Sequence, residues 1–153
     1  MKNIISLFIG LSLTTAVNLH AQAEEYEPED LIEYRQEVMG AIKGHNKAVK
    51  AILEGKVPYD GHLDMHMASL EALLGRAGEL FPEGSDFGET NAKDAVWDNP
   101  DKFKQSVEKA QNAFASFQSV LAKGDNSASL DAYKKFGKAS CGDCHKSFKK
   151  KDD

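Results

Sequence analysis

Five consecutive residues near the C-terminus, Cys141-Gly142-Asp143-Cys144-His145, carry the side chains best suited to chemistry. In a helix, Cys144 and His145 lie three and four residues after Cys141, so all three side chains leave from one face. Two thiols so placed can bond to the vinyl-derived carbons of a haem while the imidazole approaches the iron. This spacing is an attachment signature of c-type haem. It predicts one haem c per chain, held by Cys141 and Cys144, with His145 as an axial ligand of the iron.

Other interpretations of two cysteines at this spacing fit the chain less well. A thioredoxin-like redox pair requires a βαβ context, which the sequence does not offer. A structural zinc site requires four ligands, and no second cysteine pair exists, so His62 and His66 would complete it only by coincidence. An inert disulfide would leave His145 without a purpose.

The first 23 residues are typical of a secretory signal peptide. Lys2 supplies the positive start, residues 4–13 are mostly apolar, and Ala21-Gln22-Ala23 fits a small-residue cleavage site. The apolar run is well short of the ~20 residues that a membrane-spanning helix needs. We therefore expect residues 24–153 to form the mature protein, a single periplasmic domain that is not held in a membrane.

The composition limits the classes of function. The 153 residues suffice for one domain, and 41% of them are hydrophobic, so one core can form. The formal net charge is −5, which argues against binding to nucleic-acid phosphates or to an anionic membrane.

Four stretches of the chain place apolar residues at alternating steps of three and four, as in helices that bury one face. They run from Pro28 to Gly55, from an N-capping Asp60 to Pro82, from Pro100 to Gly124, and from residues 127–129 to residues 149–151. Four amphipathic helices with short links predict an all-α fold, an antiparallel up-down-up-down four-helix bundle. Residues 82–99 are expected to form an ordered loop, because they include Phe87 and Trp97.

Two polar residues occupy apolar positions of the first predicted helix. Arg35 and His45 lie on the stripe that includes Val38 and Ile42. An inward arginine needs an anion, which haem propionates would supply, and the neighbouring Gln36 can also donate to them. The alternative is that Arg35 extends to the surface from the edge of the stripe.

The mature chain as a whole resembles the class II c-type cytochromes, the cytochrome c′ family. The resemblance rests on several motifs besides Cys141–His145. They are Tyr34-Arg35-Gln36 with Met39, Lys56-Val57-Pro58-Tyr59-Asp60, Leu80-Phe81-Pro82, residues 92–97, and Phe148 after the haem motif.

This resemblance implies a haem lying lengthwise in the bundle, with His145 as the proximal ligand and Arg35 and Gln36 near the propionates. Met39 falls on the distal position, where the family divides. In high-spin members the distal residue only crowds the iron, which can then bind NO or CO; in low-spin members a methionine ligates the iron, which serves electron transfer. Met39 can do either, or simply fill the core. The resemblance also implies a homodimer through the first two helices.

One position departs from the family pattern. Many relatives carry arginine four residues after the haem histidine, and this chain has Lys149 there. Lysine keeps a cation near the proximal pocket but lacks the planar, multi-donor guanidinium group. Any proximal gas chemistry that needs that group is therefore not expected here.

We therefore expect a periplasmic monohaem cytochrome that carries electrons to and from redox partner proteins, or binds NO or CO reversibly, and is not an enzyme. One alternative is a haem enzyme for NO scavenging or peroxide removal, although no acid or base pair accompanies the haem motif. Another is a non-haem metal-binding bundle using His62 and His66. His45 would ligate iron only if the haem lay higher in the bundle than the family implies.

Overall fold

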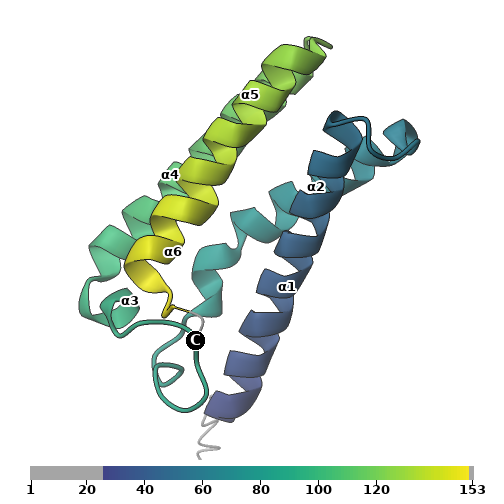
Figure 1. The fold of residues 1–153 in the computed structure, drawn as a ribbon. Helices are drawn as coiled ribbons and strands as arrows, with labels where there is room; N and C mark the ends of the chain where they lie inside the picture. Colours follow the sequence, from purple (N-terminus) through teal and green to yellow (C-terminus); the bar gives the residue numbers. More distant parts are fainter. Residues whose placement is uncertain (1–25, 152–153) are drawn as a thin grey trace, which may run out of the picture.

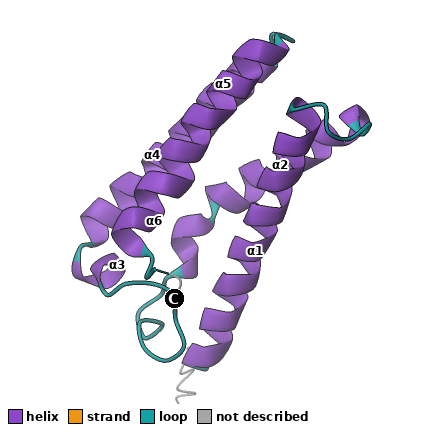
Figure 2. Cartoon of the chain, viewed as in Figure 1, coloured by secondary structure: helices purple, strands orange, loops and turns teal. Residues whose placement is uncertain are grey.

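The computed structural model describes residues 26–151, which are arranged as helices joined by loops (Figures 1 and 2). The predicted signal peptide, residues 1–23, and the first residues of the predicted mature domain lie outside the described residues. The α-helices are α1 (Pro28–Leu53), α2 (Leu63–Gly75), α3 (Ala95–Asp98), α4 (Pro100–Leu121), α5 (Asn126–Phe136) and α6 (Asp143–Phe148). Two 3₁₀ segments, η1 (Asp60–His62) and η2 (Ala77–Leu80), and one π-helical segment, η3 (Gly137–Gly142), connect them.

The helices form two antiparallel hairpins that pack together. One consists of α1 and α2, and the other consists of α4 with α5, η3 and α6 in succession (Figure 1). Contacts between α2 and α4 and between α1 and α5 join the hairpins. The predicted all-α, up-down-up-down four-helix bundle is therefore confirmed. Within residues 26–151, no helix is both long and apolar enough to cross a bilayer.

Local sequence signals explain most of the helix ends. Helix α1 starts at Pro28, whose fixed φ suits the first turn, and it is followed by Gly55 at a φ of +64°, where glycine is favoured. Helix α5 begins after Asp125, whose side chain accepts a hydrogen bond from the Ala128 N–H at 3.0 Å. The prediction that Asp60 caps the second helix is wrong, because Asp60 is the first residue of η1 and no side chain caps α2.

Two of the predicted helices, the second and the fourth, are interrupted as they approach the end of the bundle that carries the loop before α3. The second ends at Gly75, and Arg76 leaves helical geometry before η2 begins. The fourth widens into η3 between Gly137 and Gly142, where the Ser140 hydroxyl donates to the Phe136 carbonyl at 2.7 Å. π-helical turns are frequent at functional sites, and this one contains Cys141.

The core is aromatic at the α4–α5 end. Phe117 and Phe136 are almost completely buried and stack with ring centroids 5.8 Å apart, while Phe114 meets Phe136 edge-on at 5.3 Å. Val49 and Leu70 bring the other hairpin to the same cluster. These side chains fill the space between the hairpins at this end.

Candidate functional site

A cavity of about 1030 Å³ lies at the other end, between α1, the start of α4 and the C-terminal segment. Every residue that the sequence assigned to the site lines this one cavity: Arg35, Gln36, Met39, Cys141, Cys144, His145 and Lys149. The fold therefore joins residues near position 40 to residues near position 145.

The Cys141–His145 motif spans the junction between the π-helical segment η3 and the α-helix α6. Cys141 lies in η3, whereas Cys144 and His145 lie in the first turn of α6. Both cysteines are half-buried free thiols, which excludes the inert disulfide in this structure. Burial raises the pKa of Cys144, and a hydrogen bond with Ser106 opposes that rise. Burial therefore favours the neutral thiol form of Cys144.

Arg35 is buried, with only 3% of its surface exposed, so the alternative that it extends to the surface is wrong. Its Nη1 donates to the Leu80 carbonyl at 3.1 Å and to the Ser85 hydroxyl at 2.8 Å. Its Nη2 donates to the Ser85 carbonyl at 2.9 Å and to the Thr90 hydroxyl at 2.7 Å. Burial lowers the pKa of the guanidinium group. Arg35 thus fastens the loop to α1 at the edge of the cavity.

Gln36 and Met39 continue the α1 wall of the cavity. The Gln36 side-chain amide donates to the Glu89 carbonyl at 2.9 Å, which adds a second tie between α1 and the loop. Met39 is partly buried and packs against the edge of the aromatic core. The roles of Ser85 and Thr90 as partners of Arg35 had no signal in the sequence, because nothing local relates them to a helix 50 residues earlier.

The C-terminal residues from Phe148 onward are hydrogen-bonded to the loop that precedes α3. The Lys150 N–H donates to the Asn91 carbonyl at 2.8 Å, and the Lys93 N–H donates to the Phe148 carbonyl at 2.9 Å. Ala92 and Lys149 form an isolated antiparallel bridge. These bonds hold Lys149 at the cavity.

Helix α4 contributes apolar residues that the sequence assigned only to the core. Phe103, Val107 and Ala110 line the cavity, whereas Phe114 and Phe117 on the same stripe lie in the aromatic core. Apolar spacing alone cannot distinguish a residue that packs against protein from one that packs against a ligand.

The residues present fit a haem. The cavity volume is at the upper end of the ~300–1,000 Å³ typical of small-molecule sites. The lining combines apolar side chains with two thiols and one imidazole, which are the groups that covalent haem attachment and iron ligation require. The buried Asn46 Oδ1 has no hydrogen-bond partner, and Asn46 also lines the cavity.

The remaining histidines that the sequence singled out do not line this cavity. His45 and His66 pair across α1 and α2, with their Nδ1 atoms 2.9 Å apart. His62 instead stacks on Tyr59, with ring centroids 5.2 Å apart. Among the described residues, no group of three or more His, Cys, Asp or Glu side chains is placed to hold a metal ion, which argues against the zinc interpretation.

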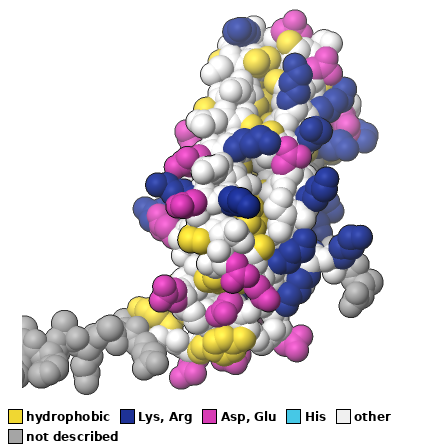
Figure 3. Space-filling view, turned by 90° about the vertical axis from the view of Figure 1, so that its left-hand side faces the viewer, with side chains coloured by type: hydrophobic (Ala, Val, Ile, Leu, Met, Phe, Trp, Pro, Cys, Tyr) yellow, Lys and Arg dark blue, Asp and Glu magenta, His cyan; other side chains and the backbone are white. Residues whose placement is uncertain are grey.

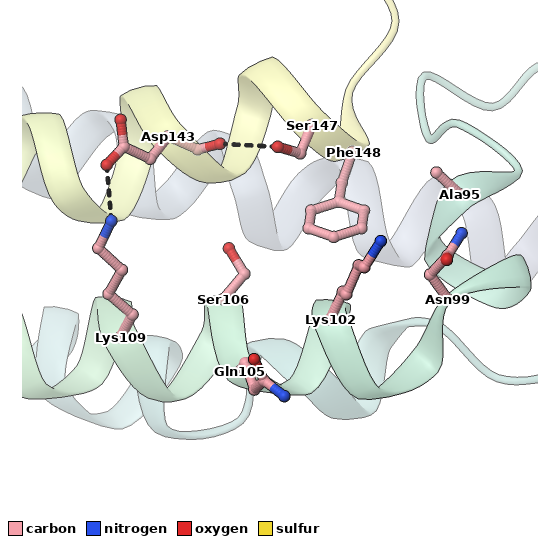
Figure 4. Close-up of a pocket in the computed structure, with 9 residues that line it drawn as sticks. All are labelled: Ala95, Asn99, Lys102, Gln105, Ser106, Lys109, Asp143, Ser147 and Phe148. Carbon is pink, nitrogen blue, oxygen red and sulfur yellow. Dashed lines mark hydrogen bonds and ion pairs between the residues drawn. The ribbon is translucent and has the colours of Figure 1, made fainter.

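A second hollow, of about 540 Å³, lies between α4 and α6 and is lined mainly by polar residues (Figure 4). Lys109 and Asp143 span it with an ion pair of 2.7 Å, and this bond lowers the pKa of Asp143. Neither cysteine of the motif and no histidine lines this hollow. The Lys109–Asp143 ion pair joins the start of α6 to α4.

Comparison with known proteins gives a consistent result. A family model described as Cytochrome C′ matches residues 30–149. The chain is 30% identical to cytochrome c′ of Pararhodospirillum photometricum over 123 residues, which cover 80% of this chain and 98% of the relative. It is 32% identical to cytochrome c-554 of Cereibacter sphaeroides over 157 aligned positions, covering 99% of this chain and all of the relative.

Solved structures agree with the sequence comparison. The crystal structure of cytochrome c′ from Rubrivivax gelatinosus is 32% identical and covers 81% of this chain and 98% of its own, with a TM-score of 0.71. The nitric oxide complex of a mutant cytochrome c′ from Alcaligenes xylosoxidans is 26% identical and covers 84% of this chain and all of its own, with a TM-score of 0.74.

Proposed function

Because the chain belongs to the cytochrome c′ family, whose members carry covalently bound haem c, we propose that it is a one-electron carrier whose haem iron is ligated by His145 and Met39. One observation carries this proposal. The two thiols and the imidazole of the motif line the same cavity as the Met39 thioether, which comes from a different helix, α1. When bound there, haem supplies an iron that cycles between ferric and ferrous states.

The chain's own residues give that cavity its properties. Cys141 and Cys144 would each hold the haem through a thioether, which would fix it relative to α6. With His145 and Met39 both available as ligands, the iron would keep the same ligand set in both oxidation states, which would favour fast electron exchange and disfavour gas binding. Phe103, Val107 and Ala110 give the cavity an apolar wall on its α4 side, which would limit the access of water to a bound haem. Arg35 and Gln36 hold the loop against α1 at the edge of the cavity, where the positive charge of Arg35 would attract the propionates, and Lys149 would place a cation near the proximal side.

The lining favours a carrier over an enzyme. In the part of the chain that the structure describes, the cavity is lined by no Asp or Glu, and His145 is its one histidine. Dedicated peroxidase chemistry requires an acid–base group beside the iron in addition to the axial ligand. With His145 assigned to the iron, the cavity offers no Asp, Glu or second His for that role.

Reversible binding of NO or CO is the second candidate. It is supported by related structures, since mutant cytochromes c′ from Alcaligenes xylosoxidans about 26% identical to this chain were solved with NO and with CO bound. In this case Met39 would lie close to the iron without ligating it, so a small gas could bind without displacing a protein ligand.

Substitution of Met39 separates the two candidates. We expect ferrous wild-type protein to show a low-spin spectrum and to take up no CO, and both Met39→Ala and Met39→Leu to become high-spin and bind CO. Met39→Leu is the matched control, because leucine crowds the site without a ligating sulfur. If wild-type protein binds CO readily, or Met39→Leu behaves like wild type, the electron-carrier assignment is wrong and gas binding is favoured.

The redox partner is proposed to carry an acidic docking surface. The chain has a net charge of −5, yet lysines gather at the cavity: Lys43, Lys93, Lys146, Lys149, Lys150 and Lys151. Figure 3 shows basic side chains collected along one edge of the molecule. Attraction between this edge and an acidic partner would be screened by salt, so the rate of electron transfer should fall as ionic strength rises.

Export and assembly complete the proposal. Residues 1–23 would direct residues 24–153 to the periplasm, which sequencing the N-terminus of the exported protein would test. A homodimer through α1 and α2 is supported by exposed Tyr34 on α1 and Met65 on α2, with exposed Tyr26 just before α1 and Tyr59 in the connection between the two helices. Sedimentation of wild type and Met65→Asp would test it, and a monomeric wild type would contradict it.

A further inference from the structure

The His45–His66 pair lies outside the proposed haem function. His45 on α1 and His66 on α2 are both half-buried, and their Nδ1 atoms face each other at 2.9 Å. The ring centroids are 5.2 Å apart, so the two rings meet nearly head-on through these nitrogens. One Nδ1 must carry the hydrogen and the other must accept it, because two bare lone pairs or two N–H groups would repel at this distance.

The surroundings of His66 favour its neutral imidazole. Burial lowers the pKa of His66, and nearby His45 and His62 lower it further. A neutral imidazole is the form that ligates a metal ion, whereas an imidazolium has no free lone pair. Both rings can offer Nδ1 to a metal ion without losing a proton overall. The accepting ring already carries its hydrogen on Nε2, and the donating ring frees its Nδ1 when its own hydrogen moves from Nδ1 to its unprotonated Nε2.

We propose that His45 and His66 chelate a divalent transition-metal ion of the Zn²⁺ class through their two Nδ1 atoms, bridging α1 and α2 outside the haem cavity. Zn–N bonds of ~2.0–2.1 Å place two nitrogens of a tetrahedral ion about 3.3 Å apart. The pair therefore needs to open by only a few tenths of an ångström, with a tilt of the rings.

Two protein ligands leave the other positions of the ion to water. No third His, Cys, Asp or Glu among the described residues joins the pair in a metal-binding arrangement. His62 is four residues before His66 on the same side of the chain, but its ring stacks on Tyr59. His62 is therefore the natural control, because an i,i+4 chelate of His62 and His66 is the competing arrangement on this surface.

The test is calorimetric titration of the haem-loaded ferric protein with Zn²⁺. We expect one ion per chain, at least tenfold weaker binding in His45→Asn and in His66→Asn, and less than a threefold change in His62→Asn. Haem spectra and circular dichroism should show that each variant is folded. A second measurement needs no variant: in ¹⁵N NMR of the wild type, Zn²⁺ should shift the ring nitrogens of His45 and His66 and leave those of His62 in place.

Three results would overturn the proposal. The first is no saturable Zn²⁺ binding by the wild type. The second is a loss in His62→Asn as large as that in His45→Asn, which would assign the ion to the i,i+4 pair. The third is ring-nitrogen shifts at histidines other than His45 and His66.

Discussion

The two ends of the bundle differ in what occupies the space between the helices. At one end, Phe114, Phe117, Tyr133 and Phe136 fill the space between the hairpins with the chain's own rings. At the other end, a cavity of about 1030 Å³ remains, and hydrogen bonds fix its edges: Arg35 ties the loop to α1, and backbone bonds tie the loop to the C-terminal segment. The first end is complete as a protein core, whereas the second is a frame built around a cofactor.

Helix α4 shows that the two ends share one sequence pattern. Its apolar stripe passes from the cavity, at Phe103 and Val107, to the packed core, at Phe114 and Phe117. The comparison therefore predicts that substitutions on one helix change either the cofactor site or the stability of the bundle, depending on which end they occupy.

The largest effect is expected from removal of the cofactor attachment. In the double variant Cys141→Ser, Cys144→Ser, neither thioether can form, so the mass of the exported chain should equal that of the bare polypeptide. Ser140→Ala, which changes the neighbouring hydroxyl only, should keep the added mass of the haem. If the double variant retains covalently bound haem, the cavity end is not the attachment site.

The next largest effect is expected in the aromatic core. Phe117 is 1% exposed, and Phe117→Ala should lower the free energy of unfolding by about 3–5 kcal/mol through lost burial and a residual cavity. Denaturant titration measures this change. The haem spectrum should stay that of the wild type, and a changed spectrum would show that the two ends are not independent.

Removal of the buried Arg35 guanidinium should weaken the attachment of the loop to α1 at the cavity end. Arg35→Met would leave buried oxygens of the loop without donors, which costs about 2–4 kcal/mol if each unsatisfied group costs ~1–3 kcal/mol and some become hydrated. Hydrogen exchange should accelerate in residues 80–90 and not in α5. The exposed Gln36→Ala is the control and should cost much less; equal effects from the two variants would contradict this role of Arg35.

The smallest effect is expected at Tyr133, which belongs to the packed end. Its hydroxyl donates to the Asn46 carbonyl at 3.3 Å, so Tyr133→Phe should cost about 0.5–1 kcal/mol at neutral pH. Burial raises the pKa of Tyr133 above its ordinary value of 10.0. Above pH 10 the unfolded chain then loses this proton while the folded chain keeps it, so wild type should lose stability that Tyr133→Phe retains. Denaturant unfolding at pH 8 and pH 11 should show that the difference in free energy of unfolding between wild type and Tyr133→Phe becomes smaller at the higher pH. A larger difference at pH 11 would contradict the expected direction.

The site was more predictable from the sequence than the local structure around it. Cys141, Cys144 and His145 carry their chemistry in their spacing, and Arg35 stands out as a charge on an apolar stripe. The partners of Arg35 were not predictable, because Ser85 and Thr90 are ordinary loop residues until the loop folds back onto α1. The break after Gly75 and the π-helical turn at Cys141 were also missed, since apolar periodicity continues across both.

The amino-acid sequence by itself determined the four helices and their buried faces and pointed to the residues proposed to attach haem, because helical periodicity and ligand spacing are local properties of the chain. Only the tertiary structure decided which part of each apolar face meets protein and which lines the cavity, that Arg35 is satisfied by neutral loop oxygens, and that His45 faces His66. These facts depend on contacts between residues far apart in the chain, and no local pattern encodes them.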